Sequence, residues 1–193
     1  MNATLATSLW PAARSNWLYE LLLAVAGSLL LAISAQIKVP FWPVPMTMQV
    51  LAVLLIGIGF GWKLGVATVL LYWAEGALGL PVFAKGNLAA YFTGPMPGPT
   101  LGYLASYPIA AGIAGWMTEG GRGRSFWMAL LGCAMALVVI YIGGYSWLRV
   151  FFGPQVAWFS GVQMFLAVDC VKVLIAALIS QTAWRQVSGR QGS

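Results

Sequence analysis

The chain has 193 residues, of which 61% are hydrophobic and 7% are charged, and its net charge is +6. A soluble domain carries roughly a quarter charged residues, so this composition indicates an all-α integral membrane protein with several spanning helices. The sequence contains no histidine and only four acidic residues, which excludes a Ser–His–Asp triad and a histidine-based metal site. The excess of Lys and Arg is typical of cytoplasmic loops rather than of a surface that binds nucleic acid.

Long apolar blocks, most of them near the length that crosses about 30 Å of hydrocarbon, predict six spanning helices. Residues 1–193 form a single expected domain, because no linker divides them. No signal-peptide cleavage site follows the first block, so this block is expected to remain as a helix. Residues 151–160 fit either a surface helix or an early start to the last span. The predicted spans are Trp17–Ala35, Met48–Phe60, Trp62–Leu78, Pro99–Met117, Phe126–Trp147 and Val162–Trp184.

The distribution of Lys and Arg between the connections predicts the orientation, because cytoplasmic loops carry the excess. An even number of spans puts both termini on one side, with cytoplasmic tails at about 1–16 and 185–193. That side holds Arg14, Lys63, Arg122, Arg124, Arg185 and Arg190, whereas the other side holds Lys38, Lys85 and Arg149. Both termini are therefore expected in the cytoplasm, with the protein in the bacterial inner (plasma) membrane.

The connections on the outer side are apolar and rich in Pro and Gly: residues 36–47, 79–98 and 143–154. Irregular backbone at a membrane is tolerated where it is buried in protein or lines a cavity, so these loops predict the walls of an outward-facing pocket. Interfacial loops with aromatic anchors are the alternative. Prolines at positions 40, 43 and 45 restrict the backbone of 36–47, which predicts a stiff flap.

The last apolar block carries two opposite charges, in the stretch AVDCVKVLIAALI at 167–179. Asp169 and Lys172 are three residues apart and share one helix face. Each charge near the bilayer centre costs roughly 2.5–3.5 kcal/mol. The pair fits either a structural ion pair or a polar site for a ligand with hydrogen-bonding groups, and we favour the ligand site because apolar packing could replace a purely structural pair.

Asn87, in the second outer loop, carries an amide that both donates and accepts hydrogen bonds. With Asp169 and Lys172 it suits a neutral ligand that has a carbonyl and N–H groups, such as a urea or an amide. Tyr91 lies four residues further on and shares a face with Asn87 if the segment is helical. The alternative for Asn87 is turn formation after Gly86.

Lys85 and Arg149 are expected near the outer rim, where either could bind a ligand carboxylate or simply extend to the membrane interface. Glu75, near the outer end of the third span, either pairs with Lys85 or lines the pocket. Cys133 and Cys170 lie inside apolar blocks and are expected to be small core residues without a disulfide.

Ala24, Ser28 and Ala32 form a stripe of small residues along the first span. Such stripes let another helix approach closely, either within the bundle or from a separate membrane subunit. The sequence has no GxxxxGK[ST] phosphate loop, so any ATP-driven step requires another protein.

Four stretches resemble the BioY family, the biotin-binding S components of energy-coupling factor (ECF) transporters. They are AISAQIKVPFWPVPMTMQVLAVLLIG (32–57), EGALGLPVFAKG (75–86), GPTLGY (98–103) and the D-x-x-K from Asp169 to Lys172. The resemblance runs over about residues 17–184.

The resemblance implies a six-helix S-component fold with an outward-facing biotin pocket, in which Asp169, Lys172 and Asn87 lie near the ureido ring. It also implies that the small-residue face of the first span docks on a transmembrane coupling subunit that works with two ATPases. Biotin is then a transported ligand and no cofactor is expected. The alternatives are a self-sufficient carrier or channel, and a small membrane enzyme that uses Asp169 and Lys172 as acid and base.

Overall fold

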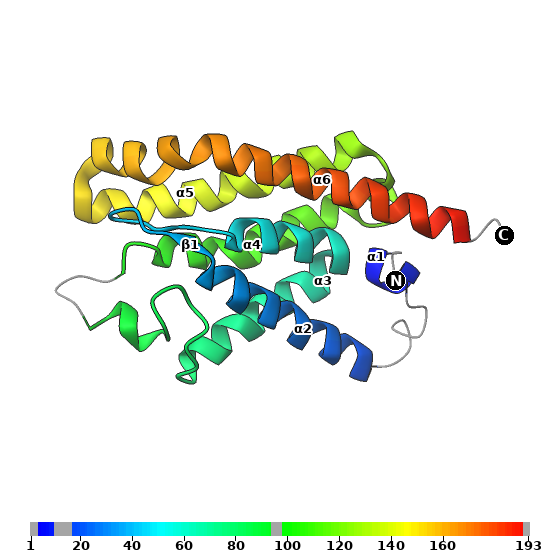
Figure 1. The fold of residues 1–193 in the computed structure, drawn as a ribbon, viewed down its shortest axis with the longest axis horizontal. Coiled ribbons are helices and arrows are strands. Elements are labelled where there is room, and N and C mark those ends of the chain that lie inside the picture. Colours follow the sequence, from blue (N-terminus) through cyan, green and yellow to red (C-terminus); the bar gives the residue numbers. More distant parts are fainter. Residues whose placement is uncertain (1–3, 10–16, 94–97, 191–193) are drawn as a thin grey trace.

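The computed structural model describes residues 4–9, 17–93 and 98–190, with side chains as far as Val187. It is an elongated helix bundle in which α5 and α6 run side by side, and both ends of the chain lie at the same end of the bundle (Figure 1). The helices are α1 (Leu5–Leu9), α2 (Trp17–Gln36), α3 (Gln49–Ala77), α4 (Leu101–Thr118), α5 (Phe126–Trp158) and α6 (Met164–Arg190). Short elements are the strands β1 (Lys38–Val39) and β2 (Met46–Thr47), the 3-10 turns Ala89–Tyr91 and Arg122–Arg124, and the π-helix η4 (Phe159–Gln163).

A break in α3 separates the second and third predicted spans. Gly61 has φ 79° and ψ 176°, a conformation that side chains with a Cβ rarely adopt. The helix ends before this glycine and resumes at Trp62, whose backbone N–H donates to Glu119 Oε1 at 2.8 Å. The two halves therefore match the predicted boundary at Phe60 and Trp62.

The last two helices are longer than the sequence predicted. Gly153 (φ 77°, ψ 166°) interrupts α5, and Pro154 then occupies the first turn of a new helical segment, where a missing N–H is tolerated. This segment continues through the π-helix into α6, so residues 151–160 include an early start to the last helix. The helix also extends to Arg190, through most of the expected C-terminal tail.

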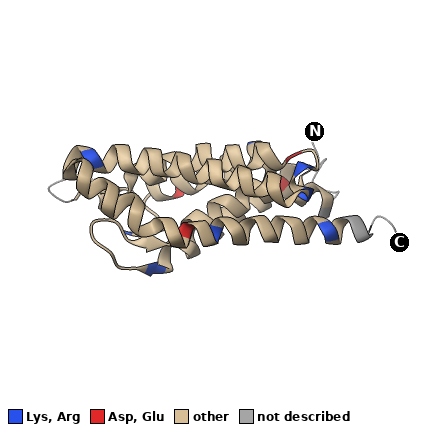
Figure 2. Cartoon of the chain, turned by 90° about the horizontal axis from the view of Figure 1, so that it is seen from above, with Lys and Arg blue, Asp and Glu red and all other residues tan. Residues whose placement is uncertain are grey.

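The expected N-terminal tail contains the short helix α1, which packs against α3 and α6. Thr4, Leu5 and Ala6 are buried there. Arg14, one of the cations used to predict the orientation, lies outside the described residues, as does the side chain of Arg190. Figure 2 shows Lys and Arg at both ends of the bundle and one acidic and one basic position close together partway along it.

The outward faces of the helices are apolar. Three stretches of the described chain are long and apolar enough to cross a membrane: Trp17–Gln36, Gln49–Ala77 and Phe126–Val187. Large exposed side chains such as Leu29 on α2 and Val171 on α6 point outward, whereas the polar residues Ser28, Thr68 and Ser180 are buried. A lipid environment favours this arrangement, in which apolar side chains face outward and polar side chains are hydrogen-bonded inside the bundle.

Helix α4 lies at the centre and packs against both α3 and α5. Glycine allows the close approach on each side. A Cβ added at Gly57 would lie 2.6 Å from the Ala111 carbonyl oxygen, and one added at Gly102 would meet the Gly143 backbone. Small residues at helix contacts let backbones approach in membrane proteins, and here they bring α3, α4 and α5 together around one polar site.

The contact at Gly57 makes a testable prediction. Gly57→Ala should destabilise the protein by about 1–3 kcal/mol, because the new methyl group overlaps backbone atoms that side-chain motion cannot move away. Gly59→Ala is the matched control on the same helix, since a Cβ added there would have nothing within 4 Å and alanine is the better helix former. Thermal unfolding of the two variants in detergent measures the difference. Equal melting temperatures would contradict the close packing of α3 on α4.

Candidate functional site

Asp169 and Lys172 form an ion pair inside the bundle. Lys172 Nζ lies 2.7 Å from Asp169 Oδ1, and the two residues are only 3% and 4% exposed. They share one face of α6, as their spacing predicts. A buried pair persists in apolar surroundings only when further hydrogen bonds satisfy both groups, and two other elements supply these bonds.

Tyr141 on α5 and Thr47 on β2 complete the polar cluster. The Tyr141 hydroxyl donates to Asp169 Oδ2 at 2.8 Å, and Lys172 Nζ donates to the Thr47 carbonyl oxygen at 2.8 Å. Neither residue is predicted from the sequence to belong to the site. A tyrosine within an apolar helix resembles many interfacial or core tyrosines, and a backbone acceptor leaves no trace in the sequence.

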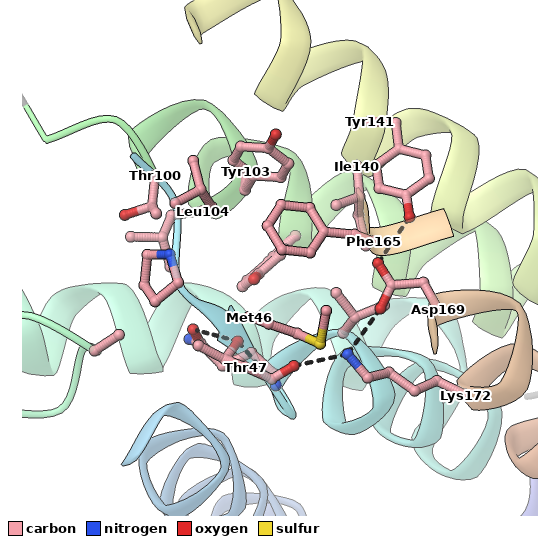
Figure 3. Close-up of a pocket in the computed structure, with 16 residues that line it drawn as sticks. Met46, Thr47, Thr100, Tyr103, Leu104, Ile140, Tyr141, Phe165, Asp169 and Lys172 are labelled. Atoms are coloured by element: carbon pink, nitrogen blue, oxygen red, sulfur yellow. Dashed lines mark hydrogen bonds and ion pairs between the residues drawn. The ribbon is translucent and has the colours of Figure 1, made fainter. Parts of the chain in front are cut away.

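The pair lies at one end of a cavity that is enclosed by α3, α4, α5, α6 and the β1–β2 hairpin (Figure 3). The space between the lining side chains is about 520 Å³, counting its opening toward solvent. Most of the lining is apolar or aromatic. The lining residues with polar side-chain groups are Thr47, Gln49, Thr100, Tyr103, Tyr107, Tyr141, Asp169 and Lys172.

The hairpin at 38–47 covers this cavity and contributes Val44, Pro45, Met46 and Thr47 to its wall. Two side chains next to and within the hairpin donate hydrogen bonds to backbone carbonyls of the connection between α3 and α4. Gln36 Nε2 donates to Phe83 O at 3.3 Å, and Lys38 Nζ donates to Ala84 O. Together with the Lys172 bond to Thr47, these contacts place the segment expected to be a flap directly over the ion pair.

Asn87 and Tyr91 lie in the connection between α3 and α4 and are not among the residues that line this cavity. The Asn87 amide holds its own loop, since Nδ2 donates to Gly79 O at 3.2 Å and Oδ1 accepts from Ala90 N at 3.0 Å. Tyr91 is 2% exposed and packs edge-on against Phe83, with ring centroids 5.9 Å apart. In this conformation Asn87 has the turn role that was its alternative.

Lys85 and Arg149 are separated in the structure. The Lys85 ammonium lies 5.9 Å from the centre of the Tyr91 ring and lines an outer space next to the hairpin. Arg149 is exposed on α5 and lines neither this space nor the cavity.

Glu75 contacts neither Lys85 nor the cavity in any described interaction. Its Oε1 accepts a 2.7 Å hydrogen bond from the Ser28 hydroxyl, which ties α2 to α3. Ala24 and Ser28 are buried and Ala32 packs against the core. The small-residue stripe is thus occupied by a contact within the chain.

The described residues contain no group of three His, Cys, Asp or Glu side chains that could bind a metal ion. Cys133 is buried, Cys170 is exposed on α6, and both are free. The chemistry of the site is therefore that of one carboxylate, one ammonium group and several hydroxyl and amide groups in an apolar enclosure. This set can orient a ligand by hydrogen bonds.

Comparisons with known proteins agree on one family. The model of the BioY family matches residues 4–189. A "Probable biotin transporter BioY" of Pyrococcus horikoshii is 42% identical over 154 residues, which cover 79% of this chain and 88% of that protein. The "Biotin transporter BioY" of Thermotoga maritima is 33% identical over 162 residues, which cover 83% of this chain and 93% of that protein.

A solved structure shares the fold. The crystal structure of the S-component for biotin from an ECF-type ABC transporter superposes with a TM-score of 0.73 at 20% identity, covering 86% of this chain and 90% of that chain. At 20% identity this match shows a shared fold. The family model and the two relatives match at the level of the amino-acid sequence. From the match over residues 4–189 and the identity to these relatives, we conclude that the chain belongs to the BioY family.

Proposed function

We propose that this protein is the high-affinity substrate-binding subunit of a biotin importer. It captures biotin in a pocket that opens to the outside of the plasma membrane and delivers it together with an ATP-driven energy-coupling module. Family membership and the transport names of the relatives support this proposal. The observation that carries it is the buried Asp169–Lys172 pair at the end of an enclosed, mostly apolar cavity.

The unused hydrogen-bonding capacity of the pair matches a cyclic urea. An ammonium group has three donors, and Lys172 uses two of them, on Asp169 and Thr47. The third can donate to the ureido carbonyl oxygen. A carboxylate has about four acceptor positions, and Asp169 uses one on each oxygen, so it can accept a ureido N–H. Asn87 and Tyr91 contact the ligand only if their loop moves toward the cavity. The ligand carboxylate is bound by Lys85 or Arg149.

In this proposal the bundle has six spans, with α3 divided at Gly61 and both termini in the cytoplasm. The hairpin and residues 79–93 lie toward the end of the bundle opposite the termini (Figure 1), as an outward-facing pocket requires. Exposed tryptophans support two interfaces. Trp17, Trp116 and Trp127 lie at the ends of α2, α4 and α5 near the termini. Trp42 lies in the hairpin, and Trp158 lies at the other end of α5.

The proposed partners are a transmembrane coupling subunit and two ATPases, since the chain itself has no phosphate loop. Docking through the stripe of Ala24, Ser28 and Ala32 requires α2 to separate from α3, because Ser28 is bonded to Glu75 across that contact. Biotin uptake by vesicles with and without the ATP-driven partners separates an importer subunit from a carrier that works alone.

Binding to the purified protein tests the proposal directly. Biotin should bind at micromolar concentration or below in calorimetry, and absence of binding would reject the function. Asp169→Asn should weaken binding by about 1–3 kcal/mol, because the amide presents one acceptor atom fewer to the ureido N–H. Glu20→Gln, the same change far from the cavity on α2, is the control. Unchanged affinity of Asp169→Asn would remove Asp169 from the site.

A further inference from the structure

A second open space lies beside the cavity on the outer side of the hairpin. We call it the vestibule, and its empty volume is about 1,140 Å³, counting space open to solvent. Two of its lining residues are lysines, Lys38 and Lys85, and three are aromatic, Phe41, Trp42 and Phe152. None of its lining residues is acidic. The vestibule therefore combines apolar walls with two positive charges and no lining counter-charge.

The cavity and the vestibule are adjacent. Pro45 and Ala84 line both spaces, and Pro99 lines the vestibule while Thr100, the next residue, lines the cavity. A ligand that fills the cavity as far as Pro45 and Ala84 therefore ends next to the vestibule.

The positions of the polar groups give the ligand a direction. Figure 3 shows Asp169 and Lys172 at one end of the cavity and Thr100 at the other. The Thr100 hydroxyl is buried there, near the Tyr91 side chain. A ligand whose polar head lies on Asp169 and Lys172 thus has its other end near Thr100, where the cavity adjoins the vestibule.

The two lysines retain donors for an anion. Lys38 Nζ donates to Ala84 O and Lys85 Nζ lies over the Tyr91 ring, yet an ammonium group has three donors. The aromatic walls suit a chain of methylene groups, since Trp42 and Phe152 pack edge-on at 5.4 Å and present carbon surface to the space. Arg149 is outside this lining.

We infer that the vestibule is a second subsite of the biotin site, which binds the carboxylate at the end of the ligand's flexible apolar tail through Lys38 and Lys85. This inference rests on the proposed function and goes beyond it, because it selects the lysines over Arg149 and gives the site a preference for an anionic tail. The ring end is recognised by the cavity, and the tail end by the vestibule.

The test compares biotin with biotinamide, which has the same rings and tail but an uncharged end. Calorimetry of the purified protein in non-ionic detergent, without anionic lipid, gives the affinity ratio of the two ligands. The wild-type protein should prefer biotin by roughly five-fold, the scale of a partly exposed ion pair. The double variant Lys38→Gln/Lys85→Gln should bring the ratio close to one, and the ratio is compared instead of the absolute affinity because Lys38 also holds the hairpin through Ala84 O. Lys63→Gln, a lysine change far from the vestibule, should keep the wild-type ratio.

The possible outcomes distinguish failure of the proposed function from failure of the vestibule assignment. If neither ligand binds the wild-type protein, the proposed function fails. If both bind equally well, or if the double variant keeps the wild-type preference, biotin capture stands and the vestibule assignment is overturned. Retained biotinamide binding shows that the double variant is folded. A salt titration of the wild-type protein needs no variant: the preference should shrink with added salt, because exposed charges are screened, and a salt-independent preference would also overturn the assignment.

Discussion

Lys172→Met is expected to destabilise the ligand-free protein by about 3–5 kcal/mol and to abolish biotin binding. The change leaves the Asp169 carboxylate 3% exposed without its cation, and an uncompensated buried charge is among the most costly defects in a protein interior. The Thr47 carbonyl oxygen loses its donor in the same step. Thermal unfolding in detergent without biotin measures the stability, and calorimetry measures the binding.

A second substitution separates the structural role of the pair from its role in binding. Asp169→Asn/Lys172→Met removes both charges, so the stability should return to within about 1–2 kcal/mol of the wild-type protein. Binding should not return, because neither the ureido N–H acceptor nor the carbonyl donor is restored. Lys63→Met, at an exposed lysine, is the control for loss of a cation. Full recovery of biotin binding by the double variant would show that the pair only stabilises the bundle.

Phe83→Ala is expected to cost about 3–5 kcal/mol, the range for a buried aromatic residue that leaves a cavity. Phe83 is 0% exposed, and its ring contacts Tyr72, Trp73 and Tyr91 at centroid distances of 5.0, 6.2 and 5.9 Å. It also lies against Gly76 of α3, where a Cβ would overlap the ring. This side chain therefore helps to anchor residues 79–93 to the bundle, along with the bond from the Tyr72 hydroxyl to Val82 O.

The same loop offers a matched control. Phe92 is 59% exposed, so Phe92→Ala removes the same group without opening a cavity and should change the stability by less than about 1 kcal/mol. The two melting temperatures in detergent give the comparison. Biotin binding by Phe83→Ala should also weaken, because the hairpin that covers the cavity packs on this loop. The backbone carbonyl of Phe83, which accepts from the Gln36 side chain, is displaced if the loop shifts. A Phe83→Ala protein as stable as Phe92→Ala would contradict the anchoring role.

The amino-acid sequence determined the family and the local features of this protein. Long apolar blocks are sufficient to predict helices, because backbone groups in lipid must be paired within the segment. Gly61 falls between two blocks, and the helix breaks there. The pairing of Asp169 with Lys172 followed from their spacing on one helix, since residues three apart share a face.

Contacts between distant segments were decided by the tertiary structure. Tyr141 and Thr47 contact Asp169 and Lys172 in a bundle where glycines let α3, α4 and α5 approach closely, and no local pattern encodes these contacts. Asn87 holds its own loop, and Ser28 is bonded to Glu75 inside the bundle, although the sequence left each with two roles. Periodicity and composition fix what lies on one helix, whereas the partner of a polar side chain across the bundle depends on the packing of all the helices.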